Sequence, residues 1–271
     1  MPVDSVNLTA SARTNLAVQQ SLASEAAKRS QNLSSGKRVN AATDDAVAFA
    51  AAKALTDRSG DLAAVKDSVG QGVSTVNAAL AGADGVSALL GQLKGIASAA
   101  IGTDNAAEKA GYAQQYNTVL GQIDSLAADS GYNGVNLLSS SSSSLTVAFS
   151  RNADDNLTVA PRDVSASGFG LSAAAADGST FSATTLAQLD AATASNNSIQ
   201  SSLGSNISAL SIRAEATQSQ ANIATAGAAS LTEADLNQEA ASLVAIRTRQ
   251  ALARGGQGIS NQAQTSLLKL F

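Results

Sequence analysis

The chain has 271 residues, a net charge of −4, and neither cysteine nor histidine. These two absences exclude disulfides, thiol nucleophiles, histidine bases and metal sites built from thiolates or imidazoles, and no cofactor is predicted. The negative net charge gives no basis for nucleic-acid binding, which needs clustered Lys and Arg. Hydrophobic residues make up 44% of the chain and aromatic residues only 3%, which is typical of long helices packed through small side chains.

The N-terminus, Met1-Pro2-Val3, lacks the basic and apolar regions of a Sec signal. No apolar run approaches the roughly 20 residues that cross a bilayer, so we expect no membrane insertion. Taken alone, these features predict a cytoplasmic protein.

The first predicted helix covers residues 6–34, because Leu8, Leu22 and Leu33 recur at helical spacing. Gly36 follows as a stop signal. By itself this pattern indicates an amphipathic surface helix.

A short polar connection leads to a second, longer helix over residues 45–101. Thr43 and Asp44 are candidate N-caps for it. Its apolar stripe alternates steps of four and three, a heptad pattern that predicts coiled-coil packing. The stripe consists of Val69, Val73, Val76, Leu80, Ala83, Ser87 and Leu90. Six glycines interrupt the helix and indicate close approach of a neighbouring helix: Gly70, Gly72, Gly82, Gly85, Gly91 and Gly95.

A turn over residues 101–105 precedes a third predicted helix over residues 106–129. Tyr112 and Tyr116 lie on its apolar stripe, so we expect them in the core rather than in a ligand site.

The middle of the chain, residues 131–185, differs from the rest. Residues 131–136 are rich in turn formers, and residues 139–144 are six consecutive serines. Residues 145–149 and 156–160 alternate as strands and predict a β-hairpin. Residues 168–185 predict a loop or a small irregular region.

Helical patterning returns over residues 186–229, and a last helix opens near residues 231–235. Thr232 is its candidate N-cap, with Asp235 at the position of a capping-box acid. Gly255, Gly256 and Gly258 predict a weak point within it.

The predicted fold is therefore mainly α. It is a long antiparallel helical bundle with coiled-coil packing, formed by the N- and C-terminal segments, and its small middle region contains a β-hairpin. An isolated helix is marginal in water, so the two ends need each other and further copies as partners.

Four separated motifs resemble those of bacterial flagellins. They are residues 32–46, 131–138, 229–241 and 259–271, and the likeness covers roughly 1–138 and 186–271. The first motif contributes Leu33, Ser34, Ser35, Gly36, Arg38, Asn40, Asp44 and Asp45.

The resemblance implies a subunit that self-assembles into the flagellar filament for motility. It implies five segments. Residues 1–40 and 231–271 are the two halves of an inner-tube domain, 41–138 and 186–230 belong to a helical rod, and 139–185 face solvent. It also implies that the protein is exported without a cleaved Sec signal and functions outside the cell, in the flagellum. The partners it implies are an export chaperone, a cap and hook-junction proteins.

Residues expected at contacts between copies are the apolar side chains of the end helices. They are Leu8, Leu22, Leu33, Leu236, Leu243, Ile259, Leu267 and Leu270. Neighbouring copies are the expected partners of these side chains.

The resemblance implies two further surface features. Serines of the tract can carry O-linked sugars, as flagellins often do, or can form a plain flexible linker: Ser139, Ser140, Ser141, Ser142, Ser143 and Ser144. Many flagellins are sensed by a Toll-like receptor through an arginine and a glutamate, and those positions align here with Gln92 and Gln115. We therefore expect weak receptor activation.

Two other functional classes remain open at this point. A hook–filament junction protein shares the terminal patterns, and a secreted coiled-coil adhesin is compatible with the heptads alone. An enzyme is not expected. The paired aspartates at 44–45 and 154–155 could bind a divalent cation, but such pairs more often cap helices and form turns.

Overall fold

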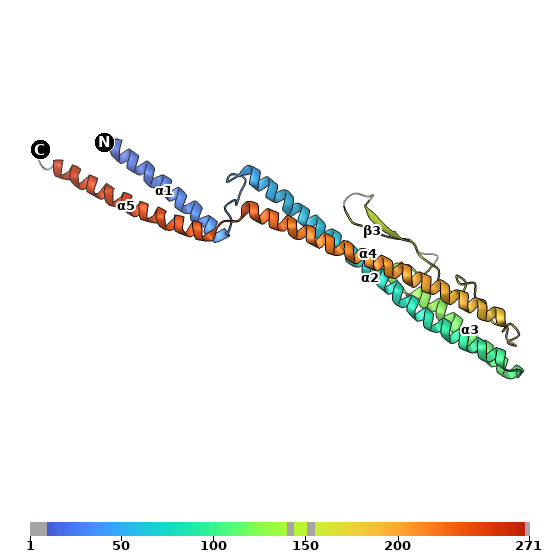
Figure 1. The fold of residues 1–271 in the computed structure, drawn as a ribbon. Helices are drawn as coiled ribbons and strands as arrows, with labels where there is room; N and C mark the ends of the chain where they lie inside the picture. Colours follow the sequence, from blue (N-terminus) through green and yellow to red (C-terminus); the bar gives the residue numbers. More distant parts are fainter. Residues whose placement is uncertain (1–9, 140–143, 151–154, 269–271) are drawn as a thin grey trace, which may run out of the picture. The chain divides into compact units, whose positions relative to one another are not determined.

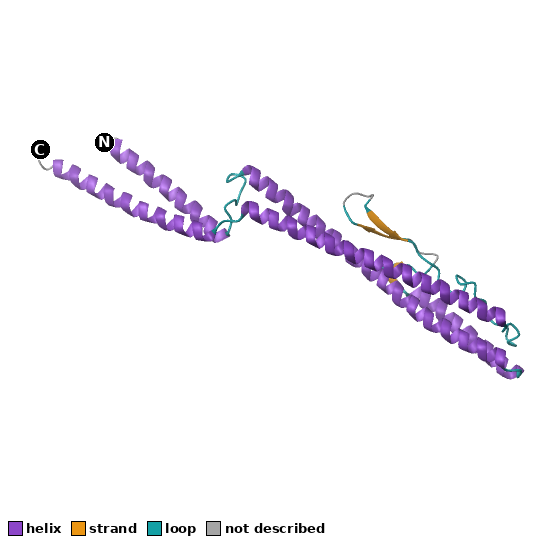
Figure 2. Ribbon diagram, in the orientation of Figure 1, coloured by secondary structure: helices purple, strands orange, loops and turns teal. Residues whose placement is uncertain are grey.

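The computed structural model describes residues 10–139, 144–150 and 155–268, and within them the chain is mainly helical (Figure 1). Figure 2 shows the small share of strand beside the long helices. The five helices are α1 (Ala10–Ser35), α2 (Ala46–Gly102), α3 (Ala106–Asp129), α4 (Ala183–Thr232) and α5 (Leu236–Leu268). The predicted fold class, a helical bundle with a small β region, is confirmed. The chain divides into two compact units, one of residues 1–58 and 223–271, the other of residues 59–222.

The terminal unit contains an antiparallel pair formed by α1 and α5, which lie side by side (Figure 1). About midway along the pair Gln250 donates a hydrogen bond to the carbonyl of Leu22, at 2.9 Å. Leu22, Leu243 and Ile246 are buried, with exposed fractions of 9%, 7% and 5%. Small side chains let the two helices approach, so the pair is held by few large apolar groups.

Helix ends in the terminal unit follow from single residues. α1 ends where Gly36 takes a positive φ of 70°, a conformation that glycine adopts without a Cβ clash. Asp45 caps α2, because its carboxylate accepts hydrogen bonds from the amides of Val47 and Ala48 at 3.1 and 2.9 Å. The predicted caps Thr43 and Asp44 are therefore wrong by one or two positions.

The last helix also begins later than predicted. α4 continues through Thr232, whose hydroxyl donates to the carbonyl of Ala228 at 2.9 Å. Asp235 is the cap of α5 and accepts from the amides of Asn237 and Gln238. The weak point predicted at residues 255–258 does not break α5, which is continuous to Leu268. A glycine lowers helix propensity by about 1 kcal/mol and need not end a helix.

The second unit packs α2, α3 and α4 around one apolar core. The heptad stripe of α2 lies in this core, with Val69, Val76, Ala83 and Leu90 fully buried and Val73 and Leu80 partly buried. Tyr116 of α3 is 2% exposed and contacts Phe181 edge-on at a centroid distance of 5.4 Å. It is a core residue, as predicted, and burial raises the pKa of its hydroxyl.

Two glycines of α2 permit close packing in this unit. A Cβ on Gly72 would lie 2.5 Å from a methyl of Val147, and one on Gly82 would lie 2.1 Å from the hydroxyl of Ser130. Gly85 likewise faces Leu126, whereas Gly70, Gly91 and Gly95 face open space. The close-approach interpretation holds for three of the six glycines, because the other three lie on the outer side of the helix.

Two small antiparallel sheets complete the second unit. β3 (Leu145–Ala148) pairs with β4 (Asn156–Val159) in the register Leu145 to Val159, so the predicted hairpin is confirmed. Arg213 of α4 holds it by an ion pair with Asp155 at 2.7 Å and by stacking over Phe149 at 4.7 Å. A second, unpredicted hairpin pairs β1 (Gly131–Tyr132) with β2 (Val135–Asn136).

The irregular segment before α4 is packed rather than loose. Val164 is fully buried, and Ala166 donates its amide to Asp124 of α3 at 2.8 Å. Asn117 of α3 exchanges two hydrogen bonds with the backbone of Ala174. This part of the middle region therefore covers α3.

By length and composition alone, α2 is apolar enough to cross a membrane, which corrects the expectation that no segment is. Its apolarity comes from alanine, valine and leucine. The largest of these side chains, including Leu90 and Leu93, are buried in the core. The core helix of a water-soluble bundle meets the same criterion, so this finding does not argue for insertion.

We predict that the α1/α5 pair is the least stable part of the monomer. It buries few large side chains, whereas Leu90, Ile123, Leu189 and Leu210 are fully buried in the second unit. Hydrogen exchange of the monomer should protect residues 75–97 strongly and residues 10–35 and 236–268 weakly. Equal protection of both regions would contradict this.

Candidate functional site

The two connections between helices in the terminal unit lie against each other. Arg38 donates its amide to the carbonyl of Thr232 at 2.8 Å, and Ala234 donates its amide to the carbonyl of Gly36 at 3.0 Å. The guanidinium of Arg38 also donates to the carbonyl of Leu231 at 2.9 Å. We call residues 36–45 and 233–235 the junction. It joins the N-terminal and C-terminal halves by main-chain hydrogen bonds.

A buried carboxylate stands beside the junction. Glu239 of α5 is 6% exposed, and both of its oxygens accept from Arg29 of α1 at 3.0 Å. Asn32, 3% exposed, donates to the same carboxylate at 3.2 Å. Asn40 of the junction in turn donates to the side-chain oxygen of Asn32 at 3.2 Å. A buried charge needs such partners, so this network fixes α1 against α5 in one register.

Asp44 holds the shape of the α1–α2 connection. Its carboxylate accepts from the amides of Asn40 and Ala41 at 3.0 and 3.2 Å and pairs with Lys28 at 3.3 Å. The Asn40 amide, then the Lys28 ammonium, then the Ala41 amide hold the pKa of Asp44 below its ordinary value. The neighbouring Asp45 is occupied as the cap of α2. Both aspartates thus serve as cap and turn former.

The other residues of the first motif also have local roles at the end of α1. Ser34 and Ser35 donate their hydroxyls to carbonyls of the last turn, at Gln31 and Asn32. Leu33 is 37% exposed. The first motif places backbone and polar contacts at the junction but does not include Arg29 and Glu239. Glu239 lies in the motif of residues 229–241, and no contact was predicted for either residue. Their signal was weak, since only the fold brings a residue 210 positions away to the same carboxylate.

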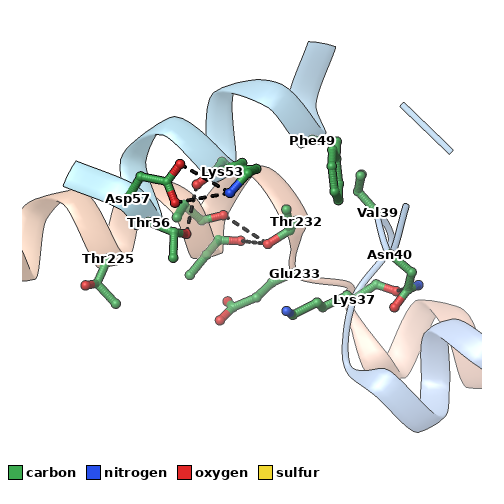
Figure 3. Close-up of a pocket in the computed structure, with 13 residues that line it drawn as sticks. Lys37, Val39, Asn40, Phe49, Lys53, Thr56, Asp57, Thr225, Thr232 and Glu233 are labelled. Atoms are coloured by element: carbon green, nitrogen blue, oxygen red, sulfur yellow. Dashed lines mark hydrogen bonds and ion pairs between the residues drawn. The ribbon is translucent and has the colours of Figure 1, made fainter. Parts of the chain in front are cut away.

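A hollow of about 420 Å³ lies beside the junction, between the start of α2 and the end of α4 (Figure 3). Its apolar side includes Val39, Phe49 and Ala52, and its rim carries Lys53, Asp57 and Glu233. Among the described residues no group of three or more acidic side chains is placed to hold a metal ion.

The proposed contact residues occupy two environments. Leu22 and Leu243 are buried within the α1/α5 pair, which corrects the expectation that only neighbouring copies could cover them. Leu236 and Ile259 are 47% and 72% exposed. Leu8 and Leu270 lie outside the described residues, as does the side chain of Leu267.

The outer side of α5 carries a second apolar stripe, of which the sequence analysis singled out only Ile259. Val244, Leu252 and Ile259 are 64%, 71% and 72% exposed. At about 100° per residue these three side chains fall within one sector of roughly 80°, turned away from the α1-facing Leu243. We call these three residues the outer stripe. Exposed apolar side chains in a row typically mark an interaction surface.

Two other predicted surfaces lie in the second unit. Gln92 on α2 and Gln115 on α3 are both exposed. In the serine tract, Ser139 is half-buried and Ser144 is exposed, while Ser140, Ser141, Ser142 and Ser143 lie outside the described residues. Their roles as receptor positions and sugar sites stay predictions.

Comparison with known proteins identifies relatives along the whole chain. Residues 5–143 match the family described as the bacterial flagellin N-terminal helical region. The chain is 30% identical to flagellins FljM and FljK of Caulobacter vibrioides and 28% identical to FljO, with 100% of each chain covered. A crystal structure of Bacillus cereus flagellin aligns with a TM-score of 0.49 and 20% identity, covering 55% of this chain and 88% of that one.

We predict that Asp44→Ala destabilises the terminal unit at neutral pH and has no effect in strong acid. A carboxylate with a lowered pKa contributes stability above its ordinary pKa of about 4, and this contribution is lost as the pH falls through its folded-state value. Melting temperatures of wild type and variant should therefore differ at pH 7 and converge in acid, at a pH below the ordinary pKa of about 4. Asp57→Ala, which removes an exposed ion pair with Lys53, is the control and should change little. A pH-independent difference for Asp44→Ala would contradict the assignment.

Proposed function

Because this chain belongs to the bacterial flagellin family and is a subunit of the flagellar filament, we propose that copies assemble through the outer stripe of α5. The observation that carries the proposal is the exposure of Val244, Leu252 and Ile259 on a helix whose opposite side is already buried against α1. A helix that is apolar on two sides needs two layers of partners. In a polymer of one chain, the second layer is another copy.

The energetics support this assignment. Burying one Val, Leu or Ile side chain is worth about 1.5–3 kcal/mol. Burying all three is therefore comparable in size to the cost of the rotational and translational freedom that a subunit loses on assembly, which is about 4–15 kcal/mol. Leu33 and Leu236, 37% and 47% exposed beside the junction, lie outside this stripe.

The proposal assigns a role to each segment. Residues 1–40 and 231–271 supply the inner assembly domain, residues 41–138 and 186–230 the helical rod, and residues 139–185 the solvent-facing part. The fold's own division falls at residues 58 and 223, inside α2 and α4. Both α2 and α4 are continuous across those points.

The chain then works outside the cell, since the flagellar filament is extracellular, and reaches its place by export without a cleaved Sec signal. An export chaperone, the cap and hook-junction proteins are its proposed partners besides copies of itself. The absence of His and Cys from the sequence supports a structural role without catalysis. O-linked sugars on the serine tract remain part of the proposal, and an intact mass above that of the sequence would support them.

We predict that Leu252→Asp abolishes filament formation while leaving the monomer folded. Leu252 is 71% exposed, so the change costs the monomer little but would bury a charge in the assembled form. Sedimentation and negative-stain microscopy of the full chain measure assembly, and circular dichroism checks the fold.

The matched control is Leu252→Met, which keeps the apolar area and should assemble as wild type does. Normal filaments from Leu252→Asp would refute the role of the outer stripe. Failure of wild type to form long uniform tubes would refute the assembly itself.

We also propose that the monomer activates the Toll-like receptor weakly. Gln92 and Gln115 lack the charge of the arginine and glutamate that the family resemblance implies, and an amide cannot replace the planar donor fork of a guanidinium. Loss of a charged hydrogen bond at an interface typically costs about 2–5 kcal/mol. Gly91 and Gly95, which face open space, further reduce the contact area.

A cell reporter assay measures this prediction. The double variant Gln92→Arg with Gln115→Glu should raise the response above that of wild type. Activation by wild type at the potency of an arginine-bearing flagellin would overturn it.

A further inference from the structure

The first turns of α2 carry an exposed apolar residue and an apolar hollow on opposite flanks. Val47 is 81% exposed, the largest exposure among the large hydrophobic side chains that the structure describes. Ala48 and Ala52, 8% and 6% exposed, mark the buried side of the helix. At about 100° per residue, Val47 stands about 100° to one side of Ala48 and Phe49 about 100° to the other.

Phe49 lines the hollow of about 420 Å³ described above (Figure 3). In the close-up its ring lies beside Val39, while Lys53, Thr56 and Asp57 continue along the same flank of α2. From the other side α4 contributes Ala228 and Ala229. The hollow is an apolar slot with charged ends.

We propose that Val47 of one copy inserts into this slot of the next copy in the filament. The inference rests on the proposed self-assembly and adds a contact distinct from the outer stripe of α5. A knob and a hole on opposite flanks of one helix cannot satisfy each other within a chain. Repeated from copy to copy they make a heterologous contact, the kind that generates an open helical polymer.

Charge complementarity favours a second copy as the occupant. Arg58 lies on the same flank as Val47, eleven residues further, which is about 16 Å along α2. Asp57, which lines the slot and pairs with Lys53 at 3.2 Å, lies eight residues beyond Phe49, about 12 Å along the helix and about 80° around it. Two parallel copies in nearly equal register that bring Val47 to Phe49 therefore bring Arg58 to the end of the slot where Asp57 lies.

The absence of cysteine from the chain permits a direct test. Val47→Cys combined with Lys53→Cys places one thiol on the knob and one at the slot. Within one chain the two residues lie on opposite flanks of a helix, so no intramolecular bond can form. Mild oxidation of assembled full-length protein should give a ladder of covalent oligomers on a denaturing gel. The same variant kept as monomer, and each single-cysteine variant in filaments, should give no ladder.

A second variant measures the strength of the contact. Val47→Asp should raise the critical concentration for assembly by about tenfold or more, the effect of losing one buried valine. Ala64→Asp, at an exposed position of α2 about 25 Å along the helix from Val47, should leave it within about twofold of wild type.

The outcomes separate this contact from assembly as such. Wild-type filaments without a cross-linked ladder, or an unchanged critical concentration for Val47→Asp, would overturn the knob-and-slot contact alone. A wild-type chain that forms no filaments would overturn the contact and the proposed function together.

Discussion

The structure depends on one constraint, which is that a long helix of small side chains has only a narrow apolar stripe to bury. Such a helix gains little from any single contact and needs a partner along its whole length. In the second unit α3 and α4 supply that partner, and Val69, Val76 and Leu90 of α2 are fully buried. In the terminal unit α1 and α5 have only each other, and the pair leaves Val244, Leu252 and Ile259 uncovered. We propose that this incomplete burial in the monomer drives the assembly of copies.

Polar contacts supply the register that small apolar side chains cannot specify. Alanine-rich surfaces slide past one another at little cost, whereas the buried carboxylate of Glu239 must meet Arg29 and Asn32. Removing one partner would leave a buried charge without compensation, so only one register of α1 against α5 is stable. Asp44 and the main-chain bonds of Arg38 extend this network into the junction. The polar motif of the sequence thus aligns α1 with α5 and the junction, and the proposed assembly contacts are made by the exposed apolar side chains of α5.

Much of this fold could be predicted from the sequence because helical periodicity and turn residues are local signals. The heptad stripe of α2, the end of α1 at Gly36 and the β3–β4 hairpin were predicted correctly. The caps were misplaced because several Asp and Thr residues compete at each connection, and only hydrogen bonding decides that Asp45 and Asp235 serve. The β1–β2 hairpin was missed although Asn133-Gly134, both with positive φ, is its usual turn pair.

Long-range features were beyond sequence reasoning for a physical reason. Burial of Glu239 depends on α1, more than 200 residues earlier, and no local pattern encodes that contact. For the same reason Leu22 and Leu243 were assigned to contacts between copies, whereas they are buried within the monomer. The outer stripe could have been predicted from the sequence, because Leu252 and Ile259 are seven residues, or about two helical turns, apart and therefore lie on one side of α5.

A helical reconstruction of the filament at side-chain resolution tests most directly whether the uncovered side of α5 drives assembly. It should show Val244, Leu252 and Ile259 buried against a neighbouring copy, with the α1/α5 pair and the Arg29–Glu239 contact preserved. A filament in which these three side chains remain in contact with solvent, while copies are held together elsewhere, would contradict the account.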